Sequence, residues 1–350
     1  MGKVCTFRKG YGISKENLSS DGTPCILYGE LYTTYKTAIA KRIKSKTSLD
    51  PTTLFHSKKN DVIIPCSGET AEDIATSVCI PYDDILLGGD LTVIRSDLDG
   101  AFLSNQINSV RKYDIARIAQ GKSIVHLQAD ELKKISIAYP TIDEQQKISG
   151  FIDKIDERIE VQNKIISDLK VLKKELCRKM LSSIAEYKPL GELCSITTGK
   201  LDANANNQNG LYPFFTCGKD TLSIDNYAFD GEAILIAGNG DIGHTKYYYG
   251  KFNAYQRTYV LMGFKADAQF VKMGIDTYLP QKISEETQGG AMPYIKLSTL
   301  TSLKIPFTTE EKQLSIRNHY DTIAQKVENE TKMLDLLLQQ KSYFLNAMFI

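Results

Sequence analysis

The sequence has little that would support a metal site or a disulfide framework. Its seven cysteines form no C-x-x-C pair, and an odd number is a poor basis for disulfides, so we expect reduced and mostly buried thiols. It has no tryptophan and only four histidines, His56, His126, His244 and His319, which lie too far apart for zinc-ligand spacing. We therefore expect no metal site.

Long apolar runs are also missing. No window approaches the roughly 18 uninterrupted apolar residues that a membrane-spanning helix needs, and residues 1–20 lack the apolar core of a signal peptide. The 350 residues, 42% hydrophobic and 24% charged, are enough for two globular units and additional helices. We expect a cytoplasmic protein without a membrane segment.

The sequence has almost no excess of one sign of charge, because its 43 basic residues nearly balance its 42 acidic ones and the net charge is +1. This balance argues against a protein that coats its whole surface with phosphate, so any contact with DNA must come from local patches. One candidate is the stretch between Leu31 and Leu49, which contains no acidic residue. It is equally compatible with a solvated face. Its cations are Lys36, Lys41, Arg42, Lys44 and Lys46.

Catalytic motifs are missing as well. The N/D-P-P-Y/F tetrapeptide of DNA methyltransferases does not occur, and no carboxylate cluster suggests a nuclease. Gly238, Gly240 and Gly243 match G-x-G-x-x-G, but an aromatic, β-like run follows them, whereas a phosphate site of this kind needs a helix N-terminus there. We therefore expect no catalysis by this chain and no nucleotide at this motif.

A repeat is present instead. A shift of 168 positions aligns the chain with itself, and the polar matches exceed what two amphipathic helices share by chance. Matched pairs include Leu132 with Leu300, Ile137 with Ile305, Thr141 with Thr309 and Gln145 with Gln313. Residues 190–200 also resemble residues 1–11. Each half thus begins alike and ends alike, while the middles, roughly 12–119 and 201–287, differ in sequence and length.

Each half ends in a long helix with a heptad seam. Residues 144–182 place apolar side chains in alternating steps of four and three, and the second helix repeats the pattern 168 residues later. Four polar side chains interrupt the seams: Gln162, Lys173, Glu330 and Lys341. One antiparallel register sets Glu330 opposite Lys173. The same register sets Gln162 opposite Lys341, so both pairs would be satisfied; the alternative is that all four reach water.

The fold class that these patterns predict is α+β, with two β-rich globular domains in tandem and two long helices that form an antiparallel coiled coil. The expected boundaries are 1–142 and 186–308 for the domains, and 143–185 and 309–350 for the helices. About 40 residues at 1.5 Å each give a helix of about 60 Å, which would act as a spacer. In the middles, strands are expected around Asp61 and Glu232 at equivalent places in the two halves.

The turns after these strands contain the candidate DNA contacts. Asn239 could read an adenine edge, Lys246 could meet a phosphate, and Tyr247 could pack on a sugar or base. An ordinary hairpin is the alternative. Arginine commonly reads guanine, although a structural salt bridge is as common an explanation. The candidates outside the basic stretch are Ser67, Arg95, Asn239, Lys246, Tyr247 and Arg257.

The arrangement resembles a known family. Two globular modules are each followed by a helix that starts P-x-x-D-E-Q-Q-K-I at 140–148 or, more weakly, P-F-T-T-E-E-K-Q-L at 306–314, where Lys312 replaces the glutamate. Together with the loops at 67–77 and 229–243, this resembles the specificity subunits of Type I restriction-modification enzymes, which carry two target-recognition domains. The resemblance covers the whole chain.

The resemblance implies a non-catalytic subunit that binds a bipartite double-stranded DNA target and docks two methyltransferase subunits, with motor-nuclease subunits joining for cleavage. S-adenosylmethionine, ATP and Mg²⁺ would be bound by those partners and not by this chain. Sequence alone leaves open a fused methyltransferase-nuclease as the partner. Two other classes also remain open: a structural adaptor that binds only protein, and an enzyme that uses the Gly238 loop for a nucleotide.

Overall fold

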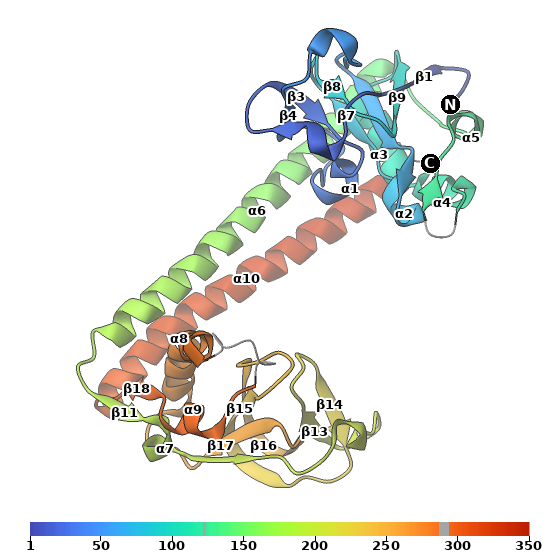
Figure 1. The fold of residues 1–350 in the computed structure, drawn as a ribbon. Helices are drawn as coiled ribbons and strands as arrows, with labels where there is room; N and C mark the ends of the chain where they lie inside the picture. The colour runs from blue at the N-terminus through green and yellow to red at the C-terminus, as the bar shows by residue number, and fades with distance from the viewer. Residues whose placement is uncertain (122–123, 287–293, 350) are drawn as a thin grey trace. The chain divides into compact units, whose positions relative to one another are not determined.

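The computed structural model describes residues 1–121, 124–286 and 294–349, and the chain forms two compact units. Unit 1 comprises Met1–Lys164 with Lys332–Ile350, and unit 2 comprises Ile165–Thr331. Two long helices contribute to both units: α6 (Ile142–Ser182) and α10 (Glu310–Met348). Each unit therefore consists of one globular domain and one stretch of each long helix (Figure 1).

The described residues of unit 1 form ten short strands. They are β1 (Cys5–Lys9), β2 (Leu18–Ser19), β3 (Thr23–Ile26), β4 (Ser45–Thr47), β5 (Asp61–Pro65), β6 (Ser67–Gly68), β7 (Val78–Ile80), β8 (Leu86–Leu87), β9 (Leu91–Ser96) and β10 (Val125–His126). Their sheets run in the orders β1-β9-β5-β7 and β2-β4-β3-β8, and β6 pairs with β10. The helices of this domain are α1 (Glu30–Thr33), α2 (Ala71–Ile74), α3 (Gly100–Asn108), α4 (Lys112–Ile118) and α5 (Ala129–Lys134), with 3-10 turns at Lys15–Asn17 and Pro51–Thr53.

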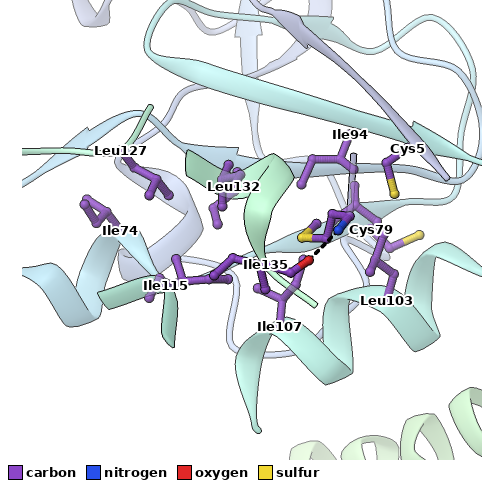
Figure 2. Close-up of a cluster of buried hydrophobic side chains, with 14 of the residues drawn as sticks. Cys5, Ile74, Cys79, Ile94, Leu103, Ile107, Ile115, Leu127, Leu132 and Ile135 are labelled. Carbon is purple, nitrogen blue, oxygen red and sulfur yellow. Dashed lines mark hydrogen bonds between the residues drawn. The ribbon is translucent and has the colours of Figure 1, made fainter. Parts of the chain in front are cut away.

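The core of unit 1 lies on both faces of the central strand β5. Val62 and Ile64 belong to an apolar cluster with α3, α4 and α5, while Ile63 belongs to a second cluster on the other face. Burial on both faces explains why the strand reads as a continuous apolar run. Figure 2 shows the first cluster, where Ile107 of α3 and Ile135 after α5 lie close together; a dashed line marks the hydrogen bond from the Met1 amino group to the Ile135 carbonyl.

Unit 2 repeats the plan with longer strands. They are β11 (Tyr187–Pro189), β12 (Ser195–Thr198), β13 (Tyr212–Phe215), β14 (Thr221–Ile224), β15 (Phe229–Ala237), β16 (Thr245–Ala254), β17 (Thr258–Met262) and β18 (Lys304–Pro306). The main sheet has the order β12-β17-β15-β16-β13-β14, and β11 pairs with β18. The helices are α7 (Leu190–Leu193), α8 (Ala268–Glu286) and α9 (Leu297–Thr301), with a 3-10 turn at Ala203–Ala205.

The two domains share a topology even where their sequences have diverged. The order β1-β9-β5-β7 in unit 1 corresponds to β12-β17-β15-β16 in unit 2. The strand β3 pairs in parallel with β8 and antiparallel with β4, just as β13 pairs in parallel with β16 and antiparallel with β14. The prediction that the Asp61 and Glu232 strands are equivalent is confirmed, because β5 and β15 occupy the same place in these orders.

One glutamine fastens each long helix to its domain. Gln145 Oε1 accepts a hydrogen bond from the backbone N–H of Asp99 at 2.9 Å, and Gln313 Oε1 accepts one from Asp267 at 2.9 Å. Each glutamine also donates to the carbonyl five residues before it, at 2.9 and 2.7 Å. Both aspartates cap the following helix, α3 or α8, through their side chains. All of these positions obey the 168-residue repeat.

The two long helices pair antiparallel within each unit, as predicted. In unit 1, the Phe151 ring of α6 meets the Phe344 ring of α10 edge-on with 4.9 Å between centroids. In unit 2, the Lys173 ammonium of α6 lies 4.4 Å from the centre of the Tyr320 ring of α10. The start of one helix therefore packs against the end of the other.

The predicted register of this pairing was wrong. Lys341 bonds Asp156 at 2.5 Å, six residues before Gln162, and Lys173 covers Tyr320, ten residues before Glu330. A shift of about one heptad still aligns the apolar heptad positions of the two helices, so the heptad pattern cannot distinguish the two registers. The observed register gives Lys341 a carboxylate in place of an amide.

Candidate nucleic-acid interface

Three loops of unit 2 meet at one end of its main sheet. The Gly238 N–H donates to the Arg257 carbonyl at 3.0 Å, and the Asp241 N–H donates to the Cys217 carbonyl at 3.2 Å. These bonds join the β13–β14, β15–β16 and β16–β17 connections. We call this surface the loop end of unit 2; it consists of residues 216–220, 238–244 and 255–257.

Two predicted contacts lie free at this loop end. The Arg257 side chain is exposed and that of Asn239 is half-buried, and neither makes a hydrogen bond or ion pair with a residue that the structure describes. A guanidinium and a carboxamide with unused donors are the groups that read guanine and adenine edges. After Gly243 the chain continues as strand β16 and not as a helix, so the glycines form a turn and lack the geometry of a phosphate site.

The other two candidates of unit 2 have partners inside the protein. Lys246 Nζ donates to the Asp220 carbonyl at 3.0 Å and to Thr221 Oγ1 at 3.3 Å, so it supports the 216–220 loop. Partial burial lowers the pKa of Lys246. The Tyr247 hydroxyl donates to Glu232 Oε1 at 2.7 Å, and burial raises the pKa of this tyrosine. Both side chains position neighbouring residues, and direct contact with DNA stays a prediction for them.

Two equivalent backbone bonds frame a corresponding loop end in unit 1, which consists of residues 66–70 and 88–90. The Cys66 N–H donates to the Asp90 carbonyl at 2.7 Å, the counterpart of the bond between Gly238 and Arg257. The Cys66 carbonyl accepts a hydrogen bond from the Leu127 N–H at 2.8 Å. The Gly238 carbonyl accepts the equivalent bond from the N–H of Ile295, 168 positions after Leu127, at 2.9 Å. Asp90 therefore occupies the place of Arg257, and the two loop ends present opposite charges at one equivalent position.

The prediction that Ser67 faces DNA was wrong. Ser67 is buried in the short strand β6 and pairs with His126 of β10. The next exposed residues are Glu69 and Thr70, and the Thr70 side chain caps helix α2. A polar Ser-Gly-Glu-Thr run resembles an exposed turn, but the ladder with β10 comes from a segment some 60 residues away and could not be read locally.

Arg95 was also assigned wrongly to DNA. Its Nε and Nη2 atoms donate to the two carboxylate oxygens of Asp61, each at 2.6 Å, and Asp61 is fully buried. This bidentate pair raises the pKa of Arg95 further. Arg95 lies near the end of β9 that is remote from the 88–90 loop. The salt-bridge alternative is the one observed.

The basic stretch divides into used and free cations. Lys41 forms ion pairs with Asp153 at 2.6 Å and Glu157 at 3.0 Å, which fasten this segment to α6. Lys36 is exposed and donates to the backbone carbonyl of Tyr32 at 2.9 Å. Arg42 is exposed and makes no side-chain bond with a described residue. Lys41 is therefore structural, whereas Arg42 is available to a ligand.

Within the described ranges no cluster of His, Cys, Asp and Glu could hold a metal ion. None of the described helices has the length and apolar character needed to cross a bilayer. The profile of the family described as Type I restriction modification DNA specificity domain matches residues 1–171 and 184–339. The chain belongs to this family. The two matched segments fall on the two repeats.

Two relatives agree with this assignment. The chain is 39% identical to the Type I restriction enzyme EcoDI specificity subunit of Escherichia coli over 158 residues, which cover 45% of this chain and 35% of that protein. It is 24% identical to the Type I restriction enzyme MjaVIII specificity subunit of Methanocaldococcus jannaschii over 274 residues, 65% of this chain and 64% of that protein. The matched segments thus span less than two thirds of either relative.

Two solved structures share the fold. The S subunit of a Type I restriction-modification system from M. genitalium superposes with a TM-score of 0.66 at 19% identity, over 100% of this chain and 94% of that one. A chain from a study of complex assembly and conformational transition of the type I R-M system gives 0.63 at 16% identity, over 99% and 95%. The α+β fold in tandem, predicted from the repeat, is confirmed.

Proposed function

We propose that this chain is the DNA sequence-specificity subunit of a Type I restriction-modification enzyme. Each unit binds one half of a bipartite target in double-stranded DNA, and the chain performs no catalysis itself. The observation that carries the proposal is the pair of loop ends. Two equivalent backbone bonds frame both of them, yet Arg257 stands in one where Asp90 stands in the other. Two loop ends with the same backbone arrangement and different side chains suit the recognition of two different half-sites.

The chemistry of the exposed groups supports DNA as the ligand. Arg257 and Asn239 offer donors of the kind that distinguish base edges, while exposed cations such as Arg42 supply phosphate contacts that position the duplex without reading it. A near-zero net charge suits a subunit that shares the duplex with other DNA-binding subunits.

The partners and cofactors follow from the same proposal. Two methyltransferase subunits dock on this subunit, and motor-nuclease subunits join them for cleavage. S-adenosylmethionine, ATP and Mg²⁺ belong to those partners. The support for this assembly is membership of the specificity-domain family, together with relatives whose names place them in Type I restriction enzymes.

Methylation mapping tests the proposal directly. A host that carries the intact operon is sequenced by a method that detects modified adenine, with a host that lacks this gene as the control. We expect a split motif with one modified adenine in each part, lost in the control. A continuous palindrome would contradict the two-reader arrangement, and an unmethylated genome with a stable complex would favour a protein-binding adaptor.

A further inference from the structure

Three exposed cations of unit 1, which we call the row, follow one another closely along the chain. Arg42, Lys44 and Lys46 are exposed, whereas the residues between and after them, Ile43, Ser45 and Thr47, are half-buried or buried. Alternation with a period of two places Lys44 and Lys46 on one face of the segment that enters β4, and Arg42 stands at the bend just before it. Lys44 and Lys46 stand roughly 7 Å apart, because each extended residue advances the chain by about 3.3 Å.

The row lies beside the loop end of unit 1. Strand β4 pairs with β3, and β3 pairs in parallel with β8 so that Ile26 is opposite Leu87. Continuing these registers sets Lys44 level with Leu87, and the Gly88 N–H donates to the Ile26 carbonyl at 3.0 Å where the 88–90 loop begins. Figure 1 shows β3, β4 and β8 in one small sheet. Two strand spacings, about 10 Å, thus separate the row from the loop.

The cations of the row have no ion-pair partner among the described residues, and the Glu30 carboxylate beside them accepts a hydrogen bond from Ser45. Among the described residues, no side chain forms a hydrogen bond or ion pair with the side chains of Arg42, Lys44 or Lys46. No acidic residue occurs between Leu31 and Leu49. Their neighbour Lys41, by contrast, is already paired with two carboxylates of α6. The three cations are therefore free to meet an external polyanion.

The equivalent strand of unit 2 carries no such row. Strand β14 pairs with β13 as β4 pairs with β3, but its four residues, Thr-Leu-Ser-Ile, carry no charge. The surrounding stretch 219–230 contains one lysine and three aspartates. The β3–β4 hairpin of unit 1 is therefore positively charged, whereas the equivalent β13–β14 hairpin of unit 2 is slightly negative.

We propose that unit 1 holds the duplex through ionic contacts from Arg42, Lys44 and Lys46 to neighbouring phosphates of one strand, whereas unit 2 contacts its half-site without such a row. This inference rests on the proposed function and adds that the two recognition domains bind DNA through different kinds of contact. The salt dependence of DNA binding is then concentrated in the first recognition domain, because each phosphate contact releases counterions.

The test measures binding of the full chain to a fluorescent random-sequence duplex across a series of potassium chloride concentrations. The triple variant R42A/K44A/K46A is compared with wild type and with K3A/K58A/K59A. The control removes the same charge from exposed lysines at the end of the β1-β9-β5-β7 sheet that is remote from the 88–90 loop. These lysines lie near the pairing of Cys5 with Ser96 and the start of β5. Thermal midpoints verify that each variant folds, and R42Q/K44Q/K46Q replaces the alanine variant if it does not.

We expect the row variant to reduce the slope of log K against log salt by about 3, since each phosphate contact contributes about 0.9. The control should reduce it by less than about 1. An equal effect of both variants, or an unchanged slope in the row variant while wild type binds, overturns the inference and leaves the proposed function intact. If wild type fails to bind any duplex even at low salt, the proposed function falls with it.

Discussion

Replacing Arg95 by alanine should destabilise unit 1 without altering which DNA is read. The guanidinium makes two bonds of 2.6 Å to Asp61, whose side chain is fully buried, and the replacement leaves that carboxylate without its cation. Breaking a buried pair on one side costs about 3–5 kcal/mol. Asp61 keeps a hydrogen bond from the backbone N–H of Lys58 at 2.8 Å, so we expect the lower end, about 3 kcal/mol.

That loss corresponds to a decrease of about 6–12 °C in the melting temperature for a unit of this size. Calorimetry gives the midpoint, and hydrogen–deuterium exchange of β5 and β9 peptides assigns the loss to unit 1, with unit 2 peptides as the internal reference. The double variant D61L/R95M should recover most of the stability, because an apolar pair can replace a buried ion pair at little cost. A stable R95A protein with altered methylation of one half-site would refute this reasoning.

Three further outcomes are expected. Gln313→Ala should lower the stability of unit 2 by about 1–2 kcal/mol in chemical denaturation, because it orphans the Asp267 N–H and a carbonyl that Gln313 bonds; an unchanged midpoint would show that water replaces both bonds. Burial, and next the nearby Lys272, lower the pKa of Lys173 below 10.5, so the folded state binds fewer protons there than the unfolded state. Stability of unit 2 should therefore rise as pH is raised through the lowered pKa towards 10.5, and K173M should lack this rise in a pH series of melting curves. Arg257→Ala should relax recognition at one half-site only, by about 1–3 kcal/mol per base pair in competition binding, and unchanged discrimination would remove it from the reading surface.

The repeat made much of the fold predictable. Thr141 and Gln145 match Thr309 and Gln313 because each glutamine bonds its domain through the same backbone groups, so the constraint is geometric and leaves a trace in the sequence. The middles leave no such trace. Their strands are held by backbone ladders, which many side chains satisfy, so equivalence of β4 and β14 emerged only from the pairing registers.

The candidate site was less predictable for a similar reason. Ser67 and Arg95 have the residue types of DNA contacts, but long-range pairing with β10 and with Asp61 decides where they point. Arg257 and Asn239 lie at the loop end as predicted, because a turn between two strong strands is a local feature. The partners of Lys41 lie more than a hundred residues away, so its ion pairs could not be predicted from the local sequence.

The division of the chain also bears on the order in which the protein is made. Unit 2 is contiguous, whereas unit 1 includes the segment from Lys332 onward, in which Phe349 is buried and packs against Phe102 with 4.9 Å between ring centroids. On the ribosome, the portion translated first must wait for the portion translated last, while the stretch between them already has all its own contacts. Nascent chains should therefore acquire protease resistance in the middle of the sequence before they acquire it at the beginning.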